Sequence, residues 1–364
     1  MKKNIIKVTI FTVLMFGFAA LNWFMPKQTY SDSERRALAP APEFSASSFL
    51  DGSFGRDFES YATDAVPFRD SLRSVKAYFS ACVLGRSENN GIFESDGHIS
   101  KVDSKIDETM LDLFAQKMEA VTKANAIDSS RLHFAIVPDK NYYILNGYPA
   151  IDYELLASKM QEKMPFAEYI DIYPYLDADS YYRTDTHWRQ EKITRVALAL
   201  AKAMGADINT MYNIDTLDND FYGVYAPQYA KKSESDTIKY LTNETLKNAK
   251  VSYVDESGMA KEGSMYDMDK AFGKDAYEMF LSGSMPVVYM ENPNAKEDKE
   301  LVIFRDSYGS SLAPLLMEGY SRITLLDIRY MNSMMAGAFA DFENADVLLL
   351  YSANLINTSS TALR

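Results

Sequence analysis

The sequence predicts an α/β protein. We expect a three-layer α/β/α domain around a parallel sheet of about five strands, with an N-terminal transmembrane helix and an irregular insertion of short strands and loops. Apolar, strand-like runs that alternate with helical patterns predict the parallel sheet. These runs occupy residues 132–137, 168–172, 301–304, 322–327 and 346–351. Helical periodicity disappears between about 207 and 297, so the insertion is expected there.

The chain begins with a segment that is long and apolar enough to cross a membrane. Lysines within the first seven residues precede an apolar run from Val8 to Met25. A helix rises 1.5 Å per residue, so this run spans roughly 27 Å, close to the thickness of the bilayer hydrocarbon. We therefore expect residues 1–27 to be an uncleaved signal anchor. A signal peptide cleaved near Gly17-Phe18-Ala19 is the alternative.

The charges that flank this run predict its orientation. Lysines precede the run, whereas Asp32 and Glu34 follow it. The positive-inside rule then places the N-terminus in the cytoplasm and the rest of the chain outside. We expect a single-pass protein of the cell membrane with an extracytoplasmic catalytic domain.

Composition excludes several classes of protein. A net charge of −13 argues against nucleic-acid binding, and 47% hydrophobic residues are typical of a globular protein. Cys82 is the lone cysteine, so no intramolecular disulfide framework can form. The chain contains neither H-E-x-x-H nor paired zinc-ligand spacing. We expect no metal and no cofactor.

Two segments separate the apolar run from the main domain. Residues 28–48 are polar and rich in Ala, Pro and Ser, which is typical of a linker. Residues 49–90 form a predicted helical cap segment, in which apolar positions have helical spacing and Pro67 breaks the pattern.

The main domain is expected to cover residues 91–364. Asp96-Gly97 predicts a hairpin, and a helical pattern follows near 104–125. A second apolar helical pattern runs from Ile193 to Met204, and Gly205 is expected to end it.

Asp185 and His187 form the most informative motif. In an extended segment, residues i and i+2 project to the same side, so these two side chains can meet. The carboxylate would then fix the imidazole tautomer and stabilise the imidazolium. Of the three histidines, His98 follows a predicted turn and His133 opens a predicted strand, which leaves His187 as the candidate base. The alternative is an ordinary helix-entry histidine packed beside Trp188.

Ser307 is the predicted nucleophile. It follows the strand-like run 301–304, where a strand is expected to turn into a helix. Such a turn exposes the hydroxyl at a sheet edge and lets backbone N–H groups face a developing oxyanion. A serine also needs a base to accept its proton, and an imidazole with a pKa near 6.5 can do this. Ser307, His187 and Asp185 are therefore predicted to converge as the triad of a hydrolase or acyltransferase.

Two sequence blocks resemble the signature blocks of the DHHW family, which is similar to the SGNH-like acetyltransferases of alginate O-acetylation. The blocks are YRTDTHW at 182–188 and RDSYGSSLAP at 305–314. The resemblance extends over most of the expected extracytoplasmic chain and implies an SGNH-like fold. Further segments that resemble the family are 33–38, 49–54, 67–70 and 327–330.

The resemblance also implies roles for individual residues. It makes Ser307 the nucleophile, His187 the base and Asp185 the residue that orients the base. Thr186 replaces a histidine of the family motif, and the serine block follows the histidine block, the reverse of ordinary SGNH enzymes. The separate glycine and asparagine oxyanion blocks of those enzymes are not identifiable. The candidate oxyanion or substrate-binding residues are Arg305, Tyr308, Arg329 and Asn354.

The implied function is O-acetylation of a cell-surface or secreted polysaccharide. The resemblance implies that a partner of the membrane-bound O-acyltransferase class supplies the acetyl group to this domain, with a glycan as acceptor. A carbohydrate esterase, a lipase-like esterase, and a non-catalytic glycan-binding or scaffold member of an acetylation complex remain open. The tyrosines of the 207–297 insertion either line a substrate groove or pack on the surface.

Overall fold

The computed structural model describes residues 2–31, 36–86, 88–89, 91–103, 105–144, 148–229, 231, 233–255 and 258–358. The chain separates into two compact units. The N-terminal unit is Met1–Asn90 with Ala226–Lys232, and the α/β unit is Gly91–Tyr225 with Ser233–Arg364.

The N-terminal unit begins with a long helix, α1 (Lys2–Phe24). Its segment Asn4–Asn22 is apolar and entirely unburied. By length and composition this helix can cross a membrane, or it can be a signal sequence. The helix ends just before Pro26, because the residue before a proline disfavours helical geometry.

The rest of the N-terminal unit is short and mainly helical. Within the predicted linker 28–48, β1 (Tyr30–Ser31) pairs with β2 (Arg36–Ala37). Three helices follow, and the break predicted at Pro67 separates the last two. They are α2 (Ala46–Leu50), α3 (Ser53–Asp64) and α4 (Arg69–Cys82), after which come β3 (Glu88–Asn89) and, much later, α8 (Tyr225–Tyr229).

The α/β unit contains the five predicted parallel strands. They lie in the order β14-β13-β15-β6-β7 within one sheet. Every residue of β6 and β15 is buried, as expected for parallel strands that are covered on both faces. The bounds are β6 (Leu132–Val137), β7 (Glu168–Tyr169), β13 (Glu300–Arg305), β14 (Arg322–Leu326) and β15 (Ala345–Ser352).

The insertion is more regular than the sequence predicted. Three antiparallel strands extend the same sheet beyond β14 to give the order β11-β10-β12-β14, and a separate hairpin pairs β8 with β9. Two short helices complete it. The bounds are β8 (Asn213–Phe221), β9 (Asp236–Thr242), α9 (Glu244–Asn248), β10 (Lys250–Val254), β11 (Ala260–Gly263), α10 (Met268–Ala271) and β12 (Val287–Glu291).

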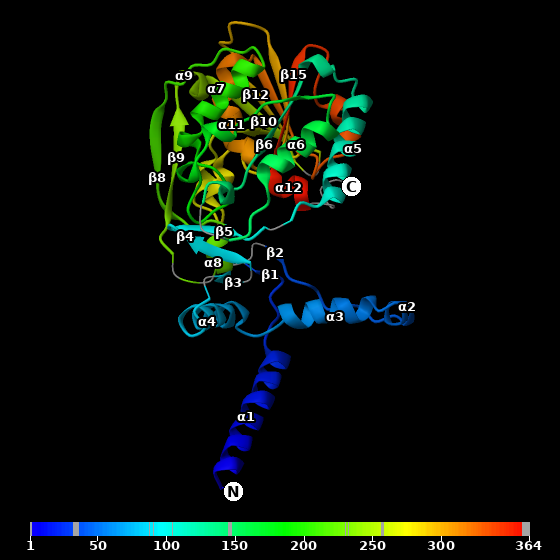
Figure 1. The fold of residues 1–364 in the computed structure, drawn as a ribbon, viewed down its shortest axis with the longest axis vertical. Coiled ribbons are helices and arrows are strands. Elements are labelled where there is room, and N and C mark those ends of the chain that lie inside the picture. The colour runs from blue at the N-terminus through cyan, green and yellow to red at the C-terminus, as the bar shows by residue number, and fades with distance from the viewer. Residues whose placement is uncertain are drawn as a thin grey trace. The chain divides into compact units, whose positions relative to one another are not determined.

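Helices cover both faces of the sheet, which confirms the three-layer α/β/α architecture (Figure 1). The β6-to-β7 and β13-to-β14 crossovers run in opposite directions along the sheet, so right-handed connections put their helices, α6 (Tyr153–Lys163) and α11 (Tyr308–Leu316), on opposite faces. Helix α7 (Thr194–Ala203) packs with α11. Helices α5 (Glu108–Ala124) and α12 (Ala353–Thr358) share the face of α6.

A hairpin of β4 (Ile92–Ser95) and β5 (His98–Lys101) precedes α5. Its turn is Asp96-Gly97, as predicted, and both residues have positive φ, at 50° and 77°. Two-residue hairpin turns of this kind need positive φ at both positions, which explains the Asp-Gly pair. The hairpin reaches the predicted histidine motif, because the Ile99 N–H donates to the Arg183 carbonyl at 2.7 Å.

Candidate active site

Ser307 lies at the carboxyl end of a central strand. Strand β13 ends at Arg305, and α11 begins at Tyr308, so the serine occupies the strand-to-helix turn. A Cβ on Gly309 would lie 2.7 Å from the Arg305 Cβ. The close return of the helix to the strand therefore requires glycine at this position, and this turn holds Ser307 at the sheet edge.

Asp185 and His187 lie in a tight loop. A single antiparallel bridge between Tyr181 and Trp188 closes the loop, and the Tyr182 N–H donates to the His187 carbonyl at 3.1 Å. The alternative interpretation of His187 as a helix-entry residue does not fit the structure, because a 3₁₀ turn separates it from the start of α7 at Thr194.

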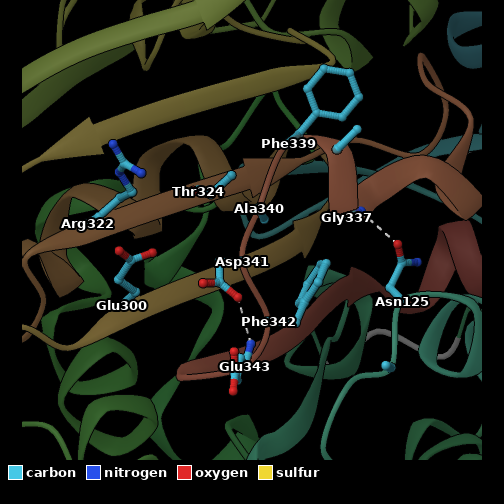
Figure 2. Close-up of a pocket in the computed structure, with 12 residues that line it drawn as sticks. Asn125, Glu300, Arg322, Thr324, Gly337, Phe339, Ala340, Asp341, Phe342 and Glu343 are labelled. Carbon is cyan, nitrogen blue, oxygen red and sulfur yellow. Dashed lines mark hydrogen bonds between the residues drawn. The ribbon is translucent and has the colours of Figure 1, made fainter.

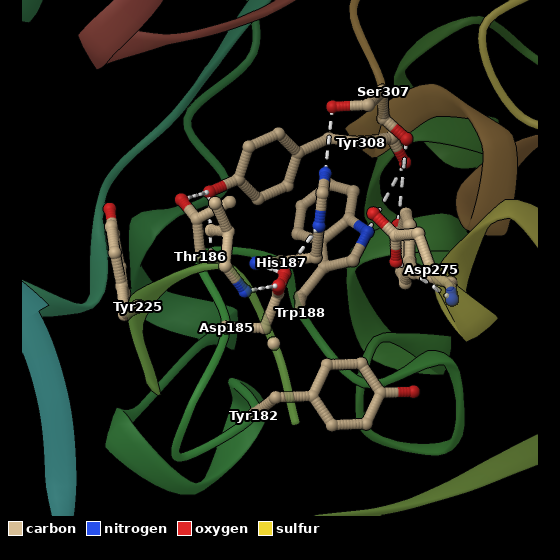
Figure 3. A network of polar contacts seen from close by, with 12 residues as sticks. Tyr182, Asp185, Thr186, His187, Trp188, Tyr225, Asp275, Ser307 and Tyr308 are labelled. Carbon is tan, nitrogen blue, oxygen red and sulfur yellow. Dashed lines mark hydrogen bonds and ion pairs between the residues drawn. The ribbon is translucent and has the colours of Figure 1, made fainter. Parts of the chain in front are cut away.

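The three side chains of the predicted triad meet (Figure 3). His187 Nδ1 lies 2.5 Å from Asp185 Oδ1, and His187 Nε2 lies 2.7 Å from Ser307 Oγ. These are hydrogen-bond distances of the kind that a serine nucleophile and its base require. The arrangement can accept a proton from the serine hydroxyl and hold the resulting imidazolium against a carboxylate.

The Asp185 carboxylate is buried, and protein N–H groups form hydrogen bonds with both of its oxygens. Its Oδ1 accepts the His187 N–H at 2.9 Å, and its Oδ2 accepts the Val224 N–H at 2.7 Å. Burial alone would raise the pKa of Asp185, but the charge and hydrogen bonds of His187, together with the Val224 N–H, outweigh burial and lower this pKa below its usual value. Asp185 is therefore ionised at neutral pH.

The insertion fixes the Asp185 loop in place. The Gly223 N–H donates to Thr184 Oγ1 at 2.9 Å, and Asp236 accepts both the Arg183 N–H at 2.8 Å and the Thr184 N–H at 2.7 Å. A Cβ on Gly223 would lie only 2.1 Å from the Asp185 Cβ, so the backbone approaches here as only glycine permits.

Tyr277, also from the insertion, lies flat on the His187 ring. The two ring centroids are 3.8 Å apart and the planes differ by 9°. The Tyr277 hydroxyl contacts Ser311 Oγ at 2.8 Å, and the Trp188 indole donates to the same oxygen at 2.9 Å. Tyr277 thus restricts the orientation of the imidazole. Sequence reasoning missed it, because no motif in 207–297 distinguishes this tyrosine from its neighbours.

Lys140 is a second residue that sequence reasoning missed. It follows β6 and is fully buried, and its Nζ donates to the carbonyls of Tyr182 at 2.8 Å, Arg183 at 3.0 Å and Asp185 at 2.8 Å. Burial lowers the pKa of Lys140 to about 8, against the opposing charge of nearby carboxylates such as Asp139. A lysine three residues after the end of a buried, mainly apolar strand is the sequence signal that could have revealed it.

Tyr308 and Arg305 lie beside the triad but are engaged elsewhere. The Tyr308 hydroxyl donates to the Thr186 carbonyl at 2.7 Å, and its N–H donates to Asp306 Oδ1 at 3.1 Å. The Arg305 guanidinium is fully buried, lies 3.5 Å from Asp327, and donates to the Gly283 carbonyl at 3.1 Å. The Tyr308 hydroxyl and the Arg305 guanidinium are therefore not free to donate to an oxyanion. The Tyr308 hydroxyl stabilises the loop at Thr186, and the Arg305 guanidinium binds groups beside the sheet.

Arg329 and Asn354 were predicted to bind the oxyanion or the substrate, and that role stays a prediction. Arg329 forms a bidentate pair with Asp327, at 2.8 Å and 2.6 Å, and so joins the ion cluster of Arg305. Asn354 is exposed on α12. Both lie at the carboxyl ends of strands, where the sequence placed them, yet Arg329 is held in a structural pair.

A pocket of about 660 Å³ lies at the other end of the strands (Figure 2). Its lining includes Glu300 and Arg322, the first residues of β13 and β14, and Asn125, whose side-chain oxygen accepts the Gly337 N–H at 2.7 Å. Ser307 follows the carboxyl end of β13. This pocket is therefore not part of the candidate site.

No protein-family model and no curated protein matches the sequence. Solved structures do. A DHHW family protein from Eubacterium siraeum superposes with a TM-score of 0.60 at 19% identity, covering 76% of this chain and 95% of that one. Bacillus cereus PatB1, solved with a sulfonyl adduct, gives 0.58 at 16% identity, covering 75% and 97%. A second PatB1 structure gives 0.58 at 14% identity, covering 76% and 99%. The resemblance to the DHHW family, predicted from two sequence blocks, is thus confirmed at the level of the fold.

Proposed function

We propose that the chain is a membrane-anchored, extracytoplasmic O-acetyltransferase that modifies a cell-surface or secreted polysaccharide. Ser307 is the nucleophile, His187 the general base and acid, and Asp185 the group that orients and stabilises the histidine. The observation that carries the proposal is the position of His187, whose two ring nitrogens lie 2.5 Å from a buried carboxylate and 2.7 Å from a serine hydroxyl.

The first half-reaction transfers acetyl to the enzyme. His187 Nε2 takes the proton of Ser307 Oγ as this oxygen attacks the carbonyl carbon of the donor ester. The new Oγ–carbon bond forms, the bond from that carbon to the donor oxygen breaks, and the leaving oxygen takes the proton from His187. The ionised Asp185 stabilises the imidazolium between these two proton transfers.

The second half-reaction transfers acetyl to the acceptor. His187 takes the proton of a sugar hydroxyl as the sugar oxygen attacks the acetyl carbon. The Oγ–carbon bond then breaks, and the proton returns to Ser307. Water in place of the sugar gives hydrolysis by the same steps, which is the esterase alternative.

The start of α11 is the proposed oxyanion site. Ser307 is the N-cap of this helix, and no acceptor for its backbone N–H occurs among the residues that the structure describes. An unpaired N–H beside the positive end of a helix favours the negative oxygen of a tetrahedral intermediate.

The substrate class rests on the resemblance of the two blocks to those of SGNH-like acetyltransferases. We further propose that a membrane-bound O-acyltransferase delivers the acetyl group, with α1 anchoring the chain in the same membrane. The sulfonyl adduct of PatB1, whose fold this chain shares, suggests a sulfonyl fluoride as a probe for Ser307.

The test uses the full chain in detergent with a small acetyl ester and candidate polysaccharides. Acetate release and acetylated sugar are measured for the wild type and for the Ser307→Ala and Ser310→Ala variants. We expect Ser307→Ala to abolish both products. Ser310→Ala should retain them, because that buried hydroxyl only approaches the Gly283 carbonyl at 3.5 Å.

The outcomes separate three functions. Acetylated sugar supports the transferase. Acetate without acetylated sugar, for every acceptor offered, favours the esterase. Glycan binding without either product contradicts the catalytic proposal and favours the non-catalytic binder.

A further inference from the structure

The N-terminal unit exposes a large apolar surface. Leu50 is 85% exposed, Phe44 69% and Val75 65%. A large side chain left in water forgoes about 1.5–3 kcal/mol of burial free energy, so a contiguous group of such residues usually marks an interaction site. The exposed apolar residues of this surface are Phe44, Phe49, Leu50, Phe58, Phe68, Leu72, Val75, Tyr78, Phe79, Val83 and Leu84.

Part of this surface is a continuous strip of aromatic rings. Phe44 contacts Phe49 and Phe54, with ring centroids 6.0 Å and 5.3 Å apart. The strip continues from Phe54 through Phe58 to Tyr61, with centroid separations of 6.1 Å and 6.3 Å. The chain therefore assembles these rings side by side rather than scattering them.

Helix α3 is amphipathic. Phe54, Phe58 and Tyr61 recur at intervals of four and three residues and so lie on one face, while Arg56 and Ser60 lie on the opposite face. Its only fully buried residue is Asp64, at its end. A helix that carries aromatic residues on one face and charged or polar residues on the other is typical of helices that lie in a membrane interface.

The surface is joined to the end of the membrane-length helix. Lys27 Nζ, just after α1, donates to the Ala65 carbonyl between α3 and α4 at 3.1 Å. Residues 25–28 and 64–71 together line a pocket of about 350 Å³. The end of α3 and the start of α4 are thus held where α1 would leave the bilayer, at the depth that aromatic side chains favour.

Charge favours the same location. On the outer side of α1, residues 25–86 contain 8 lysines and arginines against 8 acidic residues, whereas residues 87–364 contain 27 against 43. The part of the chain nearest the membrane is therefore the part that an anionic lipid surface would not repel.

We propose that α2, α3 and α4 lie on the lipid surface at the outer end of α1, with their exposed apolar side chains immersed at the boundary between headgroups and acyl chains. This inference rests on the proposed membrane location of α1. The N-terminal unit would then attach the chain twice, by one helix that crosses the bilayer and by others that lie along it.

Cys82 makes the test direct, because it is exposed, is the only cysteine, and follows the face of Val75 and Phe79 on α4. The full chain is reconstituted in vesicles of phosphatidylcholine and phosphatidylglycerol, without bromine, with bromine on the acyl chains near the headgroups, or, for Leu14→Cys at the middle of the span, with bromine near the ends of the acyl chains. A fluorophore is attached to Cys82, or to a single cysteine placed by Phe58→Cys, Ser60→Cys or Leu14→Cys in a Cys82→Ser background.

We expect brominated lipid to quench about half of the fluorescence at Cys82 and Phe58→Cys and little at Ser60→Cys, since only one face of α3 enters the lipid. Leu14→Cys reports insertion of α1 separately. Quenching at Leu14→Cys without quenching at Cys82 and Phe58→Cys would overturn the inference and leave the anchor intact, and would favour a protein partner for this surface. Quenching at Cys82 and Phe58→Cys without quenching at Leu14→Cys would support surface binding and overturn the anchor. Absence of quenching at all of these positions would overturn both.

Discussion

The two halves of the candidate site are built differently. One half, Asp185 to His187 with Ser307, is encoded in two short blocks, and each block places its side chains through local geometry, a tight loop and a strand-to-helix turn. The other half comes from the insertion, where the Val224 N–H contacts the carboxylate and Tyr277 covers the imidazole. The comparison indicates that local motifs supply the side chains of the proposed triad, whereas long-range packing restricts their orientation.

Among the changes that compare the two halves, Asp185→Asn should have the largest effect, because it directly damages the motif half, which consists of residues 185–187 and Ser307. An amide cannot hold His187 in the required tautomer or balance the imidazolium charge. We expect kcat/KM for a small acetyl ester to fall about 10⁴-fold, with the fold retained. Asp179→Asn is the control, since Asp179 is exposed and pairs only with surface cations. A loss below about tenfold would show that Asp185 does not orient the base.

Gly223→Ala tests whether the insertion half, the contacts made by residues of the 207–297 insertion, fixes the position of the Asp185 carboxylate. The added methyl group would overlap Asp185, with 2.1 Å between the two Cβ atoms, and must displace the carboxylate. A displacement of about 1 Å can cost about 100-fold in kcat, so we expect a loss of that order together with a lower melting temperature.

Gly55→Ala is the matched control for this change. Gly55 lies in α3 with open space around its Cβ position, so its substitution should leave activity unchanged and should not lower the melting temperature. Full activity of Gly223→Ala would contradict the restraint attributed to the insertion.

Two variants of Tyr277 distinguish the contribution of its ring, stacked on His187, from that of its hydroxyl, which contacts Ser311. Tyr277→Phe keeps the ring over His187 and loses the contact with Ser311, whereas Tyr277→Leu loses both. A stacked aromatic pair is worth about 1 kcal/mol, so Tyr277→Leu should lower kcat about fivefold with little change in KM, and Tyr277→Phe should lower it less. Equal losses in the two variants would assign the effect to the hydroxyl.

His98 lies on β5, the strand that contacts the loop before Asp185. Its substitution should have the smallest effect, on the pH dependence of the free energy of unfolding. Burial, aided by the charges of Lys140 and Arg183, lowers the pKa of His98 to about 4. Between pH 6.5 and about 4, the unfolded chain therefore binds a proton that the native chain excludes, and the free energy of unfolding falls as the pH falls. His98→Gln should flatten this dependence in chemical denaturation measured across that range. An unchanged slope would show that His98 does not contribute to it.

The sheet could be predicted because parallel strands covered on both faces are nearly continuous apolar runs. The runs at 132–137 and 346–351 differ from the strands of the structure by at most one residue at either end. The run at 168–172 was too long, because only Glu168 and Tyr169 pair with β6 at the edge of the sheet. Strands β10 and β12, which lie between β11 and β14, were not predicted individually. Strand β10 is only partly buried, and its sequence KVSYV mixes polar with apolar residues.

Only those parts of the candidate site could be predicted whose residues are close together in the sequence or directly follow a recognisable strand. A carboxylate two residues from an imidazole, and a serine after a buried strand, are visible in one sequence. Gly223 and Tyr277 act through contacts with segments 38 and 90 residues away along the chain, and nothing in their own neighbourhood marks them. Arg305 was assigned to the site by its position beside Ser307, but strand alternation directs its side chain to Asp327 instead.

The most direct test of the central claim, that Ser307 carries the acetyl group, is mass spectrometry of the intact chain after brief exposure to a small acetyl ester. The account predicts an adduct of about 42 Da that maps to the peptide containing Ser307, persists longer without an acceptor, and is absent from Ser307→Ala. An active wild-type chain that never shows the adduct, or an adduct that survives in Ser307→Ala, would contradict it.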